Sequence, residues 1–131
     1  MRNLNSAAGE RACYFDDVYR FEEDGSFVNV MGDSTWLEPW QGVAEEQCGP
    51  PVAPHDGSRS ATYTFDKVER KLVTQGQGSF IGLSKVHNTG EDGAPVDNTI
   101  TYDVSELTDS YLLVDIGVAG GVWWRFGLQK M

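Results

Sequence analysis

Long hydrophobic runs and basic clusters are both missing from this sequence of 131 residues. No stretch approaches the ~20 apolar residues that a membrane-spanning helix needs, so we expect no membrane span. Ten basic and twenty acidic residues give a net charge of −10. Without a basic stripe to bind phosphate, nucleic acid is not an expected partner. The opening residues, 1–6, lack a hydrophobic segment, so no signal peptide is visible.

Cysteine and histidine are scarce, with two of each. The cysteines do not have the paired spacing of a structural zinc site. Cys13 and Cys48 are therefore either two free thiols or one disulfide, and the disulfide would indicate an oxidising compartment. Nucleophile-elbow, phosphate-loop and EF-hand motifs are also missing. We expect no cofactor, with calcium at the acidic turns 22–25 and 32–34 as the weak exception, and we favour a protein that is not an enzyme.

Helical periodicity is hard to find, whereas alternation of apolar and polar residues is common. It predicts regular strands over residues 61–66, 99–104, 111–118 and 122–128, because alternate side chains of a strand face one side. Less regular strands are predicted over 13–21, 26–31, 71–74 and 79–83. Two stretches rich in proline and glycine, 39–60 and 86–98, predict long loops, which either carry function or cap the fold.

These sequential hairpins, without a crossover helix, predict one all-β domain over residues 11–131. The expected architecture is an antiparallel up-and-down barrel of about eight strands, lipocalin-like by analogy, with a two-sheet β-sandwich as the alternative. Such a barrel is either filled by side chains or hollow enough for one small ligand. Residues 1–10 are expected to form an N-terminal extension, either disordered or truncated.

Five segments have distinctive amino-acid sequences: 11–21, 24–27, 35–42, 48–57 and 123–126. Together they resemble an uncharacterised module of secreted proteins from marine bacteria, which lies beside PKD-like repeats and laminarinase-type glycoside hydrolases. Members of that module begin with a further tryptophan-containing strand that residues 1–10 do not match. The resemblance implies a secreted, carbohydrate-associated protein, and it implies no activity.

Tryptophans and a few polar residues are the candidate ligand contacts. Trp124 is predicted to lie on the inward face of its strand with Val122, Phe126 and Leu128, whereas Trp123 is predicted to point outward. Exposed rings can stack on sugars or cover a barrel end. Asp17 falls on an apolar face, where a buried carboxylate needs a partner, and Arg20, Arg125, a metal or a ligand could supply it. The predicted stacking residues are Trp36, Trp40 and Trp123, and the predicted polar contacts are His55, Asn88 and Asp17.

Three functions follow in order of preference. The first is a non-catalytic extracellular or periplasmic module that binds a small ligand or glycan. The second is a structural or interaction domain with a filled core and no small ligand. The third is a glycoside hydrolase, which would need two carboxyl groups ~5–9 Å apart in an aromatic cleft.

Overall fold

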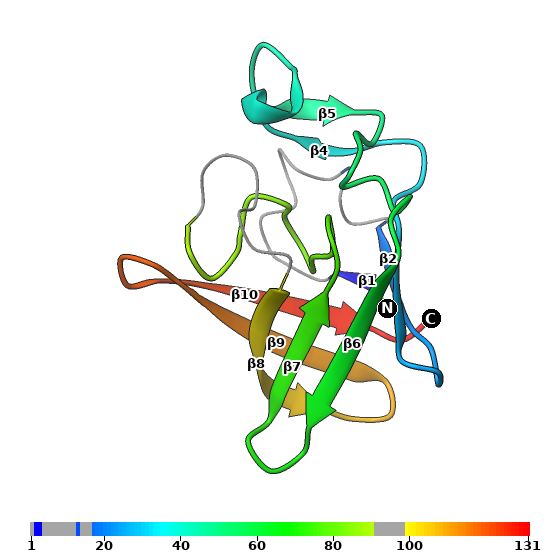
Figure 1. Cartoon of the computed structure of the whole chain (residues 1–131), viewed down its shortest axis with the longest axis vertical. Helices are drawn as coiled ribbons and strands as arrows, with labels where there is room; N and C mark the ends of the chain where they lie inside the picture. The colour runs from blue at the N-terminus through cyan, green and yellow to red at the C-terminus, as the bar shows by residue number, and fades with distance from the viewer. Residues whose placement is uncertain (1, 4–12, 14–16, 91–98) are drawn as a thin grey trace.

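The computed structural model describes residues 2–3, 13, 17–90 and 99–131 of the chain (Figure 1). Eight strands form a closed antiparallel barrel in the order β1-β10-β9-β8-β7-β6-β3-β2. This confirms the predicted all-β barrel and removes the sandwich alternative. The strands are β1 (Arg2–Asn3), β2 (Val18–Phe21), β3 (Ser26–Val30), β6 (Ala61–Asp66), β7 (Lys71–Gln75), β8 (Thr99–Leu107), β9 (Tyr111–Val118) and β10 (Val122–Gln129).

The barrel closes through its shortest strand. In β1, Arg2 pairs with both Gln129 of β10 and Val18 of β2, and Asn3 pairs with Leu128. The sequence assigns these two residues to an N-terminal extension, whereas the structure includes them in the barrel wall. Residues 4–10 lie outside the part that the structure describes.

An insertion between β3 and β6 lies outside the barrel, at the top of Figure 1. It holds a two-stranded sheet of β4 (Thr35–Leu37) and β5 (Gln47–Gly49), with a short 3-10 helix, η2 (Pro39–Gln41), between them. The predicted loop 39–60 therefore contains regular structure. Its prolines do not interrupt a ladder, because none of them lies in either strand.

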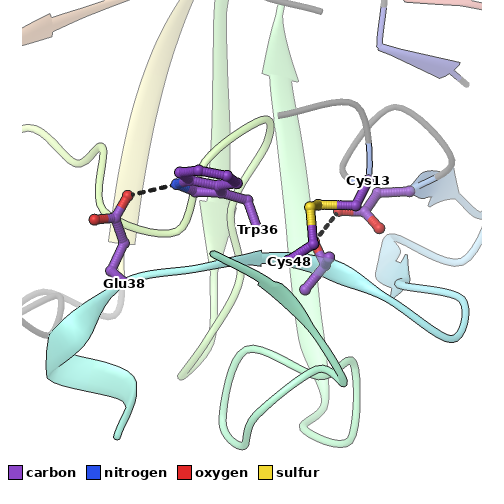
Figure 2. Close-up of a disulfide and its surroundings, with 6 residues drawn as sticks. Cys13, Trp36, Glu38 and Cys48 are labelled. Atoms are coloured by element: carbon purple, nitrogen blue, oxygen red, sulfur yellow. Dashed lines mark hydrogen bonds between the residues drawn. A yellow bond between two sulfur atoms is a disulfide. The ribbon is translucent and has the colours of Figure 1, made fainter. Parts of the chain in front are cut away.

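The two cysteines form a disulfide, as the sharper of the two predictions had it. Cys13 and Cys48 are bonded with their Cα atoms 6.0 Å apart, and Figure 2 shows the bridge beside the β4–β5 sheet. It ties β5 to the segment that precedes β2. A disulfide of this kind fits an oxidising compartment.

The predicted strand 79–83 is a buried loop, and this corrects the sequence analysis. Gly82 has φ +86°, and a Cβ there would lie 2.3 Å from the ring of Phe126, so the backbone turns where a strand would continue. The loop places Phe80, Ile81 and Leu83 in the barrel core, each at most 3% exposed. We call residues 79–86 the plug.

Tyrosine hydroxyls inside the barrel satisfy the plug backbone. The Ile81 amide donates to Tyr102 at 2.8 Å, and the Gly82 amide donates to Tyr19 at 2.9 Å. The side chain of Asn29 donates to the Phe80 carbonyl at 3.1 Å. Buried backbone groups need such partners. Side chains of the barrel wall therefore supply the plug with hydrogen bonds that a neighbouring strand would otherwise provide.

The inward faces follow the predicted alternation along most strands. Alternate residues of β8 and β9 are buried, from Ile100 to Val104 and from Leu112 to Val118. Two predictions differ from the structure. Val122, predicted to point inward, is exposed, because β10 begins beyond the core. The predicted strand 13–21 is seen as the shorter β2, which begins at Val18. Residues 14–16 are not among those described.

Candidate functional site

An apolar cavity opens at the end of the barrel opposite the β4–β5 insertion. Antiparallel alternation brings the turns after β2, β6 and β8 to this end, which we call the open end. The cavity has a volume of about 200 Å³. Its lining consists of aliphatic and aromatic side chains from five strands: Phe21, Tyr63, Phe65, Leu72, Val104, Leu107 and Leu112.

Polar atoms of this lining point away from the cavity or are bonded. The Tyr63 hydroxyl, the one polar side-chain group in the lining, donates to the Glu22 carbonyl at 2.9 Å. Of the described residues, none contributes a carboxylate, imidazole or thiol to the cavity. The cavity therefore offers no acid–base pair for hydrolysis.

Short turns leave the open end uncovered. Asp24 accepts the Ser26 amide at 2.9 Å, and Asp66 accepts the Val68 amide at 2.9 Å. Such side-chain bonds to the following backbone close a turn locally. Each connection is consequently too short to fold back into the barrel, and it leaves apolar side chains at the rim. Leu107 is 50% exposed and Val68 is 88% exposed.

Charge at the rim disfavours an anionic ligand. Taken together, the turns 22–25, 67–70 and 108–110 hold five carboxylates and two basic side chains, both of which lie in turn 67–70. The guanidinium of Arg70 is held to the wall, because its Nε donates to the Val104 carbonyl at 3.1 Å. Like charges at the entrance repel an anion, so the cavity is suited to a neutral group.

Trp36 and Trp40, two of the predicted stacking residues, are both half-buried at the other end of the barrel. The Trp36 Nε1 donates to Glu38 at 2.9 Å, as Figure 2 shows, and the ring packs against the core. The Trp40 ring instead stands edge-on to His55, with centroids 5.2 Å apart. These two rings cover the barrel end, which is the alternative that the sequence left open.

His55 is buried between the insertion and the plug. It is 4% exposed and contacts the rings of Trp40 and Phe80. Burial lowers the pKa of His55 to about 4, although neighbouring Asp56 opposes the shift. A neutral imidazole is therefore part of the packing at the covered end.

Asp17 and Asn88 have structural partners. The carboxylate of Asp17 is fully buried and accepts the Thr35 hydroxyl at 2.7 Å. Of the basic partners predicted for it, Arg20 pairs with Glu22 and Arg125 pairs with Asp115.

Asn88 bridges β8 and β9 beyond the last pair of their ladder. Its side chain accepts the Thr101 amide at 2.8 Å and donates to the Thr101 carbonyl at 3.0 Å and the Gly117 carbonyl at 3.5 Å. The six predicted ligand residues therefore do not converge on one site.

Trp123 is the predicted contact that remains exposed, at 63%. It lies on the outer wall of β10, beside the ion pair between Asp115 and Arg125.

Sequence reasoning missed the cavity because it assigned its residues to the core. The available signal was the shortness of the three turns at one end, since no connection there is long enough to cover the barrel.

Comparison with known proteins gives no relative: no protein-family model, curated protein or solved structure matches the chain. Within residues 2–3, 13, 17–90 and 99–131, no helix is long and apolar enough to cross a membrane. The same residues hold no group of three or more His, Cys, Asp or Glu side chains that could bind a metal ion.

Proposed function

We propose that the chain is a non-catalytic binding module that takes a small neutral apolar ligand into the open end of its barrel. One observation carries this proposal: the barrel is filled at its centre and covered at one end, yet an apolar cavity is left open at the other. Exposed apolar concavities are costly in water and are the usual form of a ligand site. In lipocalins, a barrel of about eight strands holds one small ligand in a similar way.

The volume limits the ligand. Apolar cavities of about 150 Å³ in other proteins hold benzene, and drug-sized ligands need pockets of about 300–1,000 Å³. A cavity of about 200 Å³ therefore suits a single ring or a short aliphatic chain. Such a group is either a whole ligand or the apolar end of a larger one.

An oxidising location supports an extracellular or periplasmic module. The Cys13–Cys48 disulfide is stable where thiols are not kept reduced. The resemblance to modules of secreted marine bacterial proteins points the same way. We propose this location and this kinship together, because both are compatible with the disulfide.

The test is a titration of the ¹⁵N-labelled protein with toluene and with 1-hexanol, followed by NMR. We expect saturable shifts confined to amides around the open end. Leu107→Trp places an indole ring over the cavity and should weaken binding at least ~10-fold, which corresponds to about 1.4 kcal/mol. Val122→Trp, an exposed apolar position away from the cavity, is the matched control and should bind as the parent does.

Two results would overturn the proposal. If neither probe binds at its solubility limit, the structural or interaction domain becomes the better description. If both tryptophan variants bind equally well, the probes occupy another site.

A further inference from the structure

The outer wall of β9 and β10 presents a fixed aromatic ring. Trp123 faces Gly117 in the antiparallel register. A Cβ on Gly117 would lie 3.1 Å from Cζ2 and Cη2 of the indole, tighter than an ordinary contact. The glycine thus makes room for the ring to rest on the β9 backbone. Because 63% of Trp123 is still exposed, the ring is positioned by the protein and available to a ligand.

A planar polar group lies next to this ring. Arg125 is two residues along β10 from Trp123, and its partner Asp115 is two residues along β9 from Gly117, so all four occupy one face of the sheet. The Arg125 Nε lies 2.6 Å from one Asp115 oxygen, and its NH2 group lies 3.0 Å from the other. This two-point pairing fixes both side chains.

The ion pair keeps hydrogen-bonding capacity on the surface. The guanidinium beside Asp115 lowers the pKa of that carboxyl, so it stays an acceptor at neutral pH. Arg125 carries five N–H donors, of which this pairing uses two. The residues around the ring and the pair form a surface hollow of about 350 Å³, lined by Asp115, Trp123, Trp124 and Arg125.

We propose that this face, comprising Trp123, Asp115 and Arg125, is a second binding site, and that its ligand is a neutral pyranose unit of a glycan. The C–H face of a pyranose ring packs on an indole, while its hydroxyl groups both donate and accept hydrogen bonds. A carboxylate and a guanidinium side by side match that dual character.

Charge selects a neutral sugar over other flat or polar ligands. The chain carries a net charge of −10, and Arg125 is already neutralised by Asp115, so an acidic polysaccharide or a nucleic acid would be repelled. This site is separate from the open-end cavity and does not depend on it.

The test is affinity electrophoresis in gels containing soluble β-1,3-glucan, β-1,4-xylan, β-1,4-mannan or α-1,4-glucan, with polygalacturonate as the acidic polymer. We expect retardation by at least one neutral polymer. Trp123→Ala should weaken that binding roughly 10-fold, the upper range for one aromatic contact, and Trp123→Phe should restore part of it. Leu107→Trp, at the open end, should leave retardation unchanged.

Three outcomes would overturn the proposal. They are no retardation by any neutral polymer, equal retardation of the parent and Trp123→Ala, and retardation by polygalacturonate alone. Thermal unfolding of each variant shows whether it is folded. If Trp123→Ala is unfolded, Trp123→Phe and Arg125→Met decide, since the first shrinks the stacking ring and the second removes the guanidinium donors. The proposal expects each to be retarded less than the parent, and retardation equal to that of the parent in both would overturn it.

Discussion

The two ends of the barrel are built from the same strands but finished differently. At the covered end, the plug inserts Phe80 and Ile81 into the core. The β4–β5 insertion covers this end, and the Cys13–Cys48 disulfide holds β5 in place. At the open end, three turns of a few residues connect the strands and leave an apolar cavity. The strands thus determine the wall, while the lengths of the connections determine which end is closed. A ligand site can arise in such a fold by shortening loops, without changing the core.

The largest contrast is expected from truncating one phenylalanine at each end. Phe80→Ala removes a buried ring of the plug and should lower the free energy of unfolding by about 3–5 kcal/mol. Phe65→Ala removes a half-buried ring that already borders a cavity, so it should cost about 1–2 kcal/mol. Urea unfolding monitored by tryptophan fluorescence measures both. Equal losses would show that the two ends are packed alike.

Removing the disulfide tests how the covered end is held. Its cysteines are separated by 35 residues in the sequence, and cross-linking a loop of that length stabilises the fold by about 3–4 kcal/mol on the chain-entropy model. The double variant Cys13→Ser with Cys48→Ser should lose that amount. Ligand probes should still bind at the open end of the folded fraction. Loss of probe binding from a folded variant would show that the two ends are coupled.

Acid should weaken the covered end through His55. Its pKa falls from 6.5 to about 4 on folding, so between these values the unfolded chain binds a proton that the folded chain excludes. The free energy of unfolding should therefore fall as the pH drops from about 6.5 to about 4, by up to about 3 kcal/mol, and then level off.

His55→Phe is the matched variant for this prediction, because it keeps an aromatic ring between Trp40 and Phe80 and cannot titrate. Carboxylates contribute equally to both proteins, so the difference between their stability–pH curves isolates His55. Parallel curves from pH 7 to pH 4 would contradict the assigned neutral imidazole.

Much of the wall could be predicted from the sequence, because alternation records which side of a strand faces the core. The segments 99–104 and 111–118 show this directly: Ile100, Tyr102 and Val104 are buried in the order that the pattern requires. The plug was mistaken for a strand for the same reason. Its apolar side chains do enter the core, but from a loop whose partners are tyrosine hydroxyls far along the sequence.

The candidate sites were harder to predict, since a cavity depends on what does not cover it. Tyr63 and Phe65 have the alternation pattern of core residues, although both line the cavity. The local sequence does not distinguish a ring that packs against another side chain from a ring that borders a cavity. Trp36 and Trp40 are four residues apart, yet one contacts Glu38 and the other His55. By contrast, alternation alone correctly predicts that Trp123 points outward, and this ring is 63% exposed.

Arg2 pairs with Gln129, so the two ends of the wall-forming chain meet on one ladder, as the neighbouring N and C labels in Figure 1 show. Any polypeptide joined to either end would leave from the same spot. In a tandem arrangement, both linkers would therefore join the barrel at one place. The barrel would project to the side of the chain and would not set the distance between the neighbouring domains. Lys130 donates its amide to the Ser110 carbonyl in turn 108–110, so a linker would leave beside the open end of the barrel. The tryptophan face lies toward the opposite end of β10 and would stay free to approach a surface.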